Sequence, residues 1–164
     1  MDQPADSLKE QRRGRRIAMT AREIGEFLRD QRICRVATVG RDGRPHNTAL
    51  WFIWDDGTVW LCSIVASQRW IDLVHNPQAS VLVDDGDAYA ELRGVELRGQ
   101  FASVGEVPRA SATDTSVERL EGKFAAKYLE GRPFAPDGRH AWLRLSPVKI
   151  VSWDFRKIGT IPGR

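Results

Sequence analysis

The sequence lacks most of the features that would assign it at once to a class of protein. Its two cysteines, Cys34 and Cys62, are too few for a disulfide framework and do not have the spacing of a metal site. The longest wholly apolar run, residues 49–54, is far too short to span a membrane. No apolar segment follows the basic N-terminus, so we expect no secretory signal and a cytoplasmic location.

Sequence motifs for catalysis and phosphate binding are also missing. The chain contains neither a Walker-type phosphate loop nor a Gly-x-Gly-x-x-Gly fingerprint. Its three histidines, His46, His75 and His140, are scattered along the chain and form no recognisable metal or acid–base constellation. We therefore expect no metal site, and the sequence alone identifies no catalytic residue.

The composition is ordinary for one soluble domain. The chain has 164 residues, of which 41% are hydrophobic and 29% charged. A net charge of +3 favours anionic ligands but does not demand nucleic acid. Basic residues concentrate in residues 9–16, so we expect residues 1–19 to form a flexible basic tail. The alternative is an arm that reaches a polyanionic cofactor or nucleic acid.

The body of the chain, residues 20–158, has the pattern of a mainly β protein, followed by a short tail, 159–164. Strands are expected at 35–39, 45–54, 58–63, 79–83, 88–104, 140–145 and 148–155. The apolar parity of 88–104 changes near Arg93-Gly94, which indicates a β-bulge there. Early strands are linked by hairpin turns, which predicts an antiparallel Greek-key barrel with peripheral helices.

Three helices are expected around this barrel. Thr20 and Glu23 have capping-box spacing, and so do Thr115 and Glu118, so helices should begin at both threonines. Ser67 is the N-cap candidate of the remaining helix, which Asn76-Pro77 ends.

The segment Ser67-Gln68-Arg69 has a specific physical use, because it opens a helix straight after a strand. The first N–H groups of a helix are unpaired and attract phosphate, and a hydroxyl with a guanidinium completes an anion cradle. The alternative, which spacing alone favours, is that Ser67 only caps the helix and Arg69 is a solvated charge. Arg35 could likewise be an edge-strand arginine, and Trp153 ordinary core.

Several short motifs, in this order and spacing, carry a resemblance to a known family. They are Arg35-Val36-Ala37-Thr38-Val39, Asp42-Gly43-Arg44-Pro45-His46, Trp51-Phe52, Ser67-x-Arg69, Asn76-Pro77, Glu91-Leu92-Arg93-Gly94-Val95, Asp137-Gly138-Arg139-His140-Ala141-Trp142 and Ser152-Trp153-Asp154. Together they resemble the pyridoxamine 5′-phosphate oxidase-like flavin-binding split-barrel family, in its actinobacterial branch of FMN- and deazaflavin-dependent enzymes.

The resemblance implies a split β-barrel that forms a homodimer, with two equivalent cofactor sites at the interface. Carried over by position, the cofactor-binding residues are Arg35, Val36, Ala37, Thr38, Val39, His46, Asn47, Thr48, Cys62, Ser63, Ser67, Gln68, Arg69 and Trp153. Ser67 and Arg69 stand at the phosphate end. Trp153 is expected to approach the ring from the partner subunit.

The same resemblance implies an oxidoreductase that transfers a hydride between a bound cofactor and a small planar organic substrate. The cofactor would be FMN, with the deazaflavin coenzyme F-420 as the alternative. The alternative function is a non-catalytic flavin, haem or deazaflavin carrier or sensor on the same fold. Two departures stand out: Ala49 replaces a frequent proline, and Arg69 replaces a frequent lysine. Substrate residues of true pyridoxamine phosphate oxidases are not evident.

Overall fold

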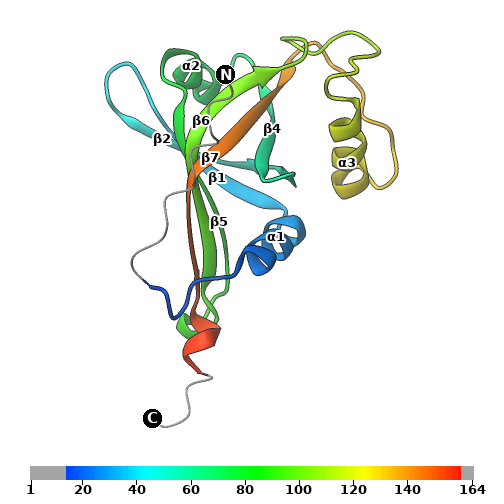
Figure 1. Ribbon diagram of the computed structural model, residues 1–164. Helices are drawn as coiled ribbons and strands as arrows, with labels where there is room; N and C mark the ends of the chain where they lie inside the picture. The colour runs from blue at the N-terminus through cyan, green and yellow to red at the C-terminus, as the bar shows by residue number, and fades with distance from the viewer. Residues whose placement is uncertain (1–13, 160–164) are drawn as a thin grey trace, which may run out of the picture.

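The computed structural model describes residues 14–159, which form one curved sheet with helices packed against it (Figure 1). The seven strands lie in the order β2-β1-β5-β6-β7-β4-β3, and each neighbouring pair is antiparallel. Their bounds are β1 Ile33–Val39, β2 Pro45–Trp51, β3 Ile53–Asp55, β4 Thr58–Ile64, β5 Gln78–Asp85, β6 Arg93–Val104 and β7 His140–Asp154. The expected fold class, a mainly antiparallel split barrel with peripheral helices, is confirmed.

Three α-helices and two short 3-10 turns complete the fold: α1 Ala21–Asp30, α2 Gln68–His75, α3 Glu118–Tyr128, η1 Tyr89–Glu91 and η2 Phe155–Ile158. The capping box at the start of α1 is confirmed, since Thr20 Oγ1 accepts from Glu23 N and Glu23 accepts from Thr20 N. α1 buries Phe27 and Leu28 against the sheet. α3 stands to one side of the barrel (Figure 1).

Apolar side chains fill the concave side of the sheet and a second, smaller core beneath α3. The main core is built on inward-facing strand residues such as Val36, Leu61, Val81 and Leu97, all 0% exposed. The second core packs Leu120, Phe124 and Tyr128 of α3 against Ile53 and Trp142. This second core is what holds α3 beside β3 and β7.

The strand expected at residues 45–54 is divided in two by a contact from α3. The backbone of Phe52 leaves the sheet, and its N–H donates to Tyr128 Oη at 3.2 Å. The same hydroxyl donates to the carbonyl of Phe52 at 2.7 Å. The Tyr128 hydroxyl thus takes the place of the backbone hydrogen bonds that a neighbouring strand would make to Phe52.

The predicted position of the β-bulge, near Arg93-Gly94, was wrong. Residues before Arg93 form η1 instead of strand, and the register shift lies between Arg98 and Gly99. There Gly99 pairs with Pro147, and Val148 has no partner on β6. The two strands expected at 140–145 and 148–155 are therefore one long strand, β7, because the irregularity accommodates a proline that lacks an N–H.

The helix expected to start at Thr115 begins later. α3 starts at Glu118, its N-cap is Val117, and no side chain caps it. Asp114 takes the local hydrogen bonds instead, accepting from Ser116 N at 3.0 Å and from Glu106 N at 2.8 Å. These bonds hold the preceding loop and not the first turn of the helix.

Part of the expected N-terminal tail lies on the sheet. Met19 is buried, and its N–H donates to Ser152 Oγ at 3.0 Å, while Asp154 N donates to the carbonyl of Ile17 at 2.7 Å. The basic run at 9–13 and the residues after 159 lie outside the described residues. Within 14–159, no helix combines the length and apolar character needed to cross a membrane.

Candidate functional site

Arg69 lies at the centre of the polar residues that the sequence singled out. It is only 8% exposed, so the alternative of a solvated surface charge was wrong. Its Nη1 donates to Thr48 Oγ1 at 2.7 Å, and its Nη2 donates to Ser63 Oγ at 3.0 Å. The first turn of α2 thus brings Arg69 against β2 and β4, and three of the expected site residues meet here.

No acidic side chain among residues 14–159 compensates the charge of Arg69. Its Nε is buried without a hydrogen-bond partner, and no carboxylate among residues 14–159 lies within ion-pair distance. Burial lowers the pKa of this guanidinium. A buried cation with spare donors is costly unless an anion pairs with it. The residues present therefore fit a phosphate-bearing cofactor.

Ser67 is engaged in the fold itself. Its Oγ accepts from Trp70 N at 3.2 Å and donates to the carbonyl of Ile64 at 2.8 Å, so the expected N-cap is confirmed. Its single hydroxyl proton would have to leave Ile64 to reach a phosphate. The first N–H groups of α2, those of Gln68 and Arg69, have no partner within the helix by its geometry. They are better placed as phosphate donors than the Ser67 hydroxyl.

Thr38 and Gln68 belong to a second polar group on the other side of α2. Both donate to buried Asp72, Thr38 Oγ1 at 2.7 Å and Gln68 Nε2 at 2.7 Å. Burial would raise the pKa of Asp72, but these two bonds and the nearby His46 and His75 lower it overall. The Thr38 hydroxyl therefore connects β1 to α2 through Asp72.

The remaining β1 residues alternate between the two faces of the sheet. Val36 points into the core, whereas Arg35, Ala37 and Val39 lie on the outer face beside Asn47 of β2. Arg35 is not on an edge strand, because β1 lies between β2 and β5, and it is ion-paired with Asp84. The structure thus divides the expected β1 residues between two faces.

Trp153 lies on that same outer face, far along β7. It is partly buried, and its ring lies against Gly94 of β6, where a Cβ atom would come within 2.4 Å of Trp153 Cζ2. Only glycine leaves room for the ring at this position. Trp153 is therefore part of a sheet surface and not of the main core.

Cys62 faces a cavity of about 520 Å³ between β2, β4, α3 and the loop 131–139. Leu50 and Leu129 form apolar parts of its wall, and Trp51, Phe124 and Phe134 supply aromatic rings. Burial raises the pKa of the Cys62 thiol to about 12, helped by the charges of Asp137 and Glu121. Cys62 is thus a neutral residue in the wall of this cavity. The volume of the cavity lies within the range typical of small-molecule sites.

His140 and Asp137 stand at the rim of this cavity. His140 Nδ1 lies 2.6 Å from Asp137 Oδ2, and Asp137 Oδ1 accepts from the backbone N–H groups of Arg139 and His140. Burial alone would raise the pKa of Asp137, but these hydrogen bonds lower it to about 2. In the sequence, His140 is one of three scattered histidines, and nothing there signals its pairing with Asp137, which depends on the turn made by Gly138.

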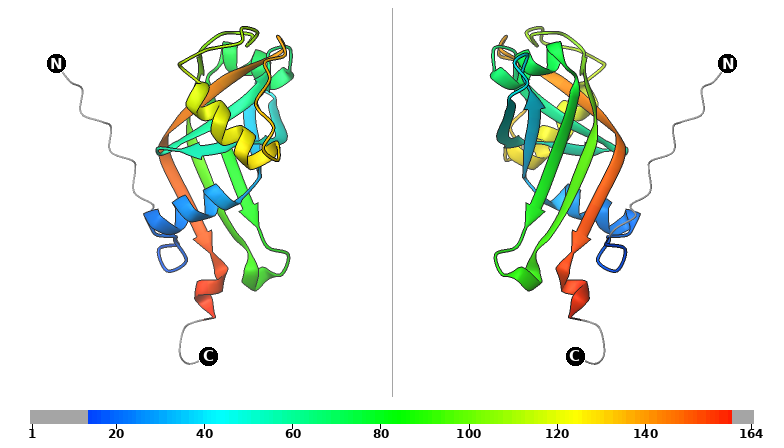
Figure 2. Two further views of the ribbon diagram at one scale, coloured as in Figure 1. Left: turned by 90° about the vertical axis from the view of Figure 1, so that its right-hand side faces the viewer. Right: turned by 90° about the vertical axis from the view of Figure 1, so that its left-hand side faces the viewer.

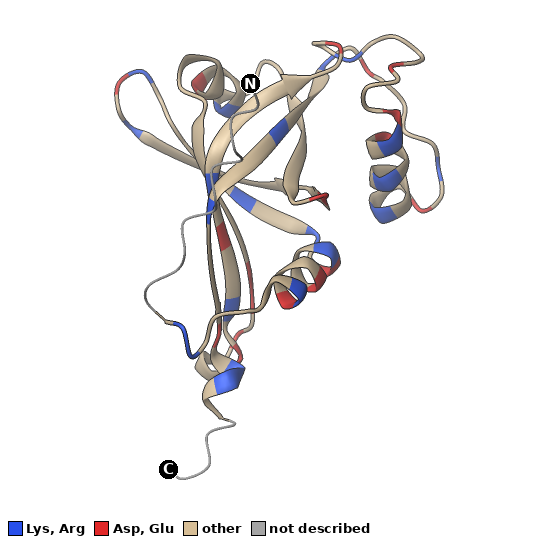
Figure 3. Cartoon of the chain, in the orientation of Figure 1, with Lys and Arg blue, Asp and Glu red and all other residues tan. Residues whose placement is uncertain are grey.

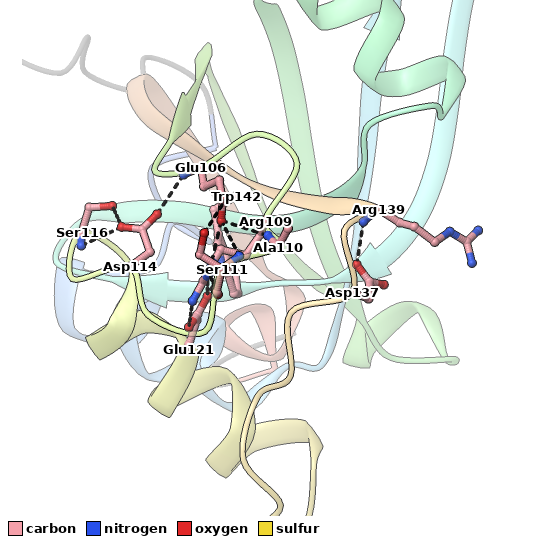
Figure 4. A network of polar contacts seen from close by, with 10 residues as sticks. All are labelled: Glu106, Arg109, Ala110, Ser111, Asp114, Ser116, Glu121, Asp137, Arg139 and Trp142. Carbon is pink, nitrogen blue, oxygen red and sulfur yellow. Dashed lines mark hydrogen bonds and ion pairs between the residues drawn. The ribbon is translucent and has the colours of Figure 1, made fainter.

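A buried arginine that the sequence did not single out holds this rim in place (Figure 4). Arg109 Nε donates to Glu121 Oε1 of α3 at 2.8 Å, and its guanidinium also contacts Glu106 and the carbonyl of Ser111. Its own backbone N–H donates to the carbonyl of His140 at 2.7 Å. Arg109 therefore fixes both α3 and the start of β7. Nothing in its local sequence distinguishes it from a surface arginine.

Residues 20–154 match the protein family described as pyridoxamine 5′-phosphate oxidase. A conserved hypothetical protein, Rv2991 of Mycobacterium tuberculosis, is 30% identical with a TM-score of 0.76, covering 95% of this chain and 96% of its own. No curated protein matches the sequence.

More distant structures share the fold. An F420 reductase has 22% identity and a TM-score of 0.59, covering 76% of this chain and 93% of its own. An FAD-binding protein of Mesorhizobium loti has 18% identity and a TM-score of 0.60, covering 82% and 94%. The expected resemblance is confirmed by the family match over most of the described residues. The chain belongs to the pyridoxamine 5′-phosphate oxidase family.

Proposed function

We propose that this protein is an oxidoreductase that holds a phosphate-bearing flavin-type cofactor through Arg69. FMN is the cofactor we favour, and the deazaflavin coenzyme F-420 is the alternative. The substrate is a small planar organic molecule that exchanges a hydride with the bound cofactor. When bound, the cofactor supplies the redox chemistry, and the protein supplies binding, orientation and electrostatics.

The single observation that carries this proposal is the uncompensated charge of Arg69. A buried guanidinium with an unpartnered Nε and no carboxylate of residues 14–159 beside it is poorly satisfied by that part of the chain. A phosphate group would supply the opposite charge and acceptors for the Nη1 and Nη2 hydrogens that Thr48 and Ser63 leave unused. Thr48 and Ser63, which already bind the guanidinium, would fix its orientation toward that phosphate.

The start of α2 adds to this attraction. The N-terminus of a helix carries partial positive charge and free N–H groups, which favour phosphate. α2 has no acidic residue in its first turn, so nothing there opposes an anion. In this proposal Gln68 and Arg69 contribute backbone donors, and Ser67 acts chiefly as the cap that holds them.

We also propose that two copies pair through the outer face of the sheet. The outer face of β5, β6 and β7 carries no helix (Figure 2, right). Ile33 and Val39 of β1, on this face, are 50% and 39% exposed although they are apolar. In such a dimer Arg35, Asn47 and Trp153 would lie at or near the interface, with the cofactor sites beside it.

Enzyme and carrier differ in what they require beside the cofactor. A carrier needs only the phosphate anchor and a place for the ring, whereas an oxidoreductase also needs room for a substrate. The cavity beside Cys62 offers that room, with aromatic walls suited to a flat molecule. This favours the enzyme. Acidic and basic residues are mixed over α1 (Figure 3), so this helix does not present the continuous basic face expected of a nucleic-acid site.

The experiment is a cofactor titration of the purified protein, followed by absorption and fluorescence. Wild type should bind FMN or the deazaflavin with a shifted spectrum. Arg69→Ala should weaken that binding more than tenfold, because a charge-assisted hydrogen bond contributes about 1.5–3 kcal/mol. Arg22→Ala is the matched control, since Arg22 is an exposed arginine on α1 that pairs with Glu26.

Turnover separates the two functions. An oxidoreductase should pass reducing equivalents from the reduced cofactor to an added acceptor, whereas a carrier should bind without turnover. If neither cofactor bound at high micromolar concentration, the proposed function would be wrong. If Arg69→Ala bound like Arg22→Ala, the phosphate would have to sit elsewhere.

A further inference from the structure

A second cavity, of about 670 Å³, lies between the last turn of α1, the turn that joins β3 to β4, and α3. Within residues 14–159 it has no lining residue in common with the cavity beside Cys62. Ile53, Trp54 and Ala126 supply apolar parts of its wall. Its volume lies within the range typical of small-molecule sites, so an organic ligand would fit in it.

The charged side chains of this cavity do not balance. It is lined by three basic residues and two acidic ones, namely Arg29, Lys123, Lys127, Asp55 and Asp56. Lys123 forms an ion pair with Asp55, so these two charges compensate each other. Arg29 and Lys127 then stand against Asp56, an exposed residue of the turn. The lining therefore carries one excess positive charge.

Lys127 is a partly buried cation with donors to spare. Its Nζ donates to the carbonyl of Gln31, the residue that ends α1, at 2.5 Å, and lies 4.6 Å from the centre of the Phe52 ring. No carboxylate of residues 14–159 lies within ion-pair distance of it. Burial lowers the pKa of this ammonium to about 8, and the charge of Arg32 acts in the same direction, while Asp30 opposes it. At neutral pH the group is thus mostly protonated, with two N–H bonds left for a ligand.

Two further donors converge beside Gly25 of α1. Arg29 Nη2 and Trp54 Nε1 each lie 3.9 Å from the position that a Cβ atom on Gly25 would take. Neither side chain makes a hydrogen bond to any part of residues 14–159. Because glycine has no side chain, the space beside these two donors stays open. α1, β3 and α3 therefore each contribute one donor to the lining of the same cavity.

We propose that this cavity is a binding site for an organic monocarboxylate. The carboxylate accepts hydrogen bonds from Lys127, Arg29 and Trp54 Nε1, and the apolar body of the ligand lies against Ile53 and Ala126. Binding would give the partly buried ammonium the anionic partner that it lacks among the described residues. The site does not depend on the proposed function, because no residue of the proposed phosphate anchor lines it.

The charge of the lining favours a carboxylate over a phosphate. A monoanion matches the single excess positive charge, and its two oxygens match the planar fork of Arg29. A phosphate ester with two negative charges would exceed that charge, and Asp56 would repel it more strongly. A neutral ligand would leave the ammonium of Lys127 without a counter-charge. The three classes of ligand should therefore differ in affinity.

The experiment is an NMR titration of the full chain at neutral pH with naphthoate, a carboxylate on a flat apolar body. Naphthalenemethanol is the neutral analogue, and naphthyl phosphate is the dianionic one. Affinities are taken from the indole N–H signal of Trp54, which Trp54→Phe identifies by its loss. We expect naphthoate to shift this signal and to bind about tenfold more tightly than the alcohol, because it accepts charge-assisted hydrogen bonds. The phosphate should bind no more tightly than naphthoate.

Two variants test the donors. Lys127→Gln should weaken naphthoate binding about tenfold. Arg29→Gln should weaken it about threefold, since an exposed cation contributes less. Arg22→Gln is the matched control, because it removes the same charge from an exposed position on α1 and should bind like wild type. Thermal melting checks the fold of Lys127→Gln, which also loses the bond to Gln31, and the exposed Arg29 keeps the test independent of that bond.

Four results would overturn the inference. Equal affinities for naphthoate and naphthalenemethanol would show that no cation of the site binds the carboxylate. Equal affinities in Arg29→Gln and Arg22→Gln would contradict the predicted donors. Tighter binding of naphthyl phosphate would contradict the class of ligand, and an unshifted Trp54 signal would mean that naphthoate does not enter this cavity. None of these results affects the proposed cofactor site, which is tested through Arg69.

Discussion

Arg69 Nη2 donates to Ser63 Oγ at 3.0 Å, and this bond joins the first turn of α2 to β4. Ser63 is fully buried on β4, whereas its neighbour Cys62 faces the aromatic cavity on the opposite side of the strand. One strand thus separates the proposed phosphate anchor from the proposed substrate cavity. A cofactor that reaches both would have its phosphate at one and its ring beside the other.

Ser67→Ala should mainly affect stability. The cap to Trp70 N would be lost, which costs about 1 kcal/mol, and cofactor affinity should fall less than in Arg69→Ala. Urea unfolding and FMN titration of the two variants check this. A Ser67→Ala protein of unchanged stability but tenfold weaker FMN binding would show that the hydroxyl is a phosphate ligand first.

Arg109→Ala should destabilise the protein by about 3–5 kcal/mol, because it leaves Glu121 beside the core without its buried partner. Arg22→Ala removes an ion pair with Glu26 in which both side chains are exposed, 84% and 53%, and should cost about 0–1 kcal/mol. Chemical unfolding of both variants gives the comparison. Equal losses would mean that Arg109 does not anchor α3.

Tyr128→Phe removes the hydroxyl that replaces the sheet ladder at Phe52. The N–H of Phe52 would be left buried without a partner, so we expect a loss of about 1–3 kcal/mol. Hydrogen exchange should also become faster at Phe52 and at the end of β2. Unchanged exchange there would show that the break in the strand does not depend on α3.

Features that depend on neighbouring residues could be predicted from the sequence, whereas contacts between distant residues could not. The caps at Thr20 and Ser67 and the hairpin strands depend on residues within a few positions, so they were predicted correctly. The break at Phe52 depends on a side chain 76 positions away, and no local pattern signals it. The continuity of β7 through Pro147 likewise depends on a register shift opposite Gly99.

The candidate site could also be predicted only in part, because some of its contacts join residues that are distant in the sequence. Family spacing identified Ser63 and Arg69, which the structure brings together with Thr48. It could not show that Arg69 lacks an acidic partner among the described residues, because that depends on every element around it. It also missed His140 and Asp137, which become a pair only through the turn between them.

Stability should fall in acid partly through Asp137. Its pKa is lowered to about 2 in the folded protein, so the folded carboxyl binds a proton more weakly than the unfolded one. Its contribution is full above the ordinary carboxyl range, about pH 4, and is lost as the pH falls to about 2. Melting temperature against pH should therefore drop less steeply in this window in Asp137→Asn. An identical slope would contradict the hydrogen bonding described here.

Gly94→Ala should displace the ring of Trp153. The added Cβ would lie 2.4 Å from Cζ2 of that ring, and overpacking of this kind costs about 1–3 kcal/mol. Tryptophan fluorescence and sedimentation of the variant report the displacement and any loss of the proposed dimer. Unchanged spectra and stability would show that the ring moves aside freely.

The central claim is that Arg69 holds a phosphate, and comparing FMN with riboflavin tests it most directly, because the two share a ring and differ in the phosphate. Wild type should bind FMN far more tightly than riboflavin, and in Arg69→Ala this preference should shrink by more than tenfold, while riboflavin binding changes little. An equal preference for FMN in both proteins would contradict the claim.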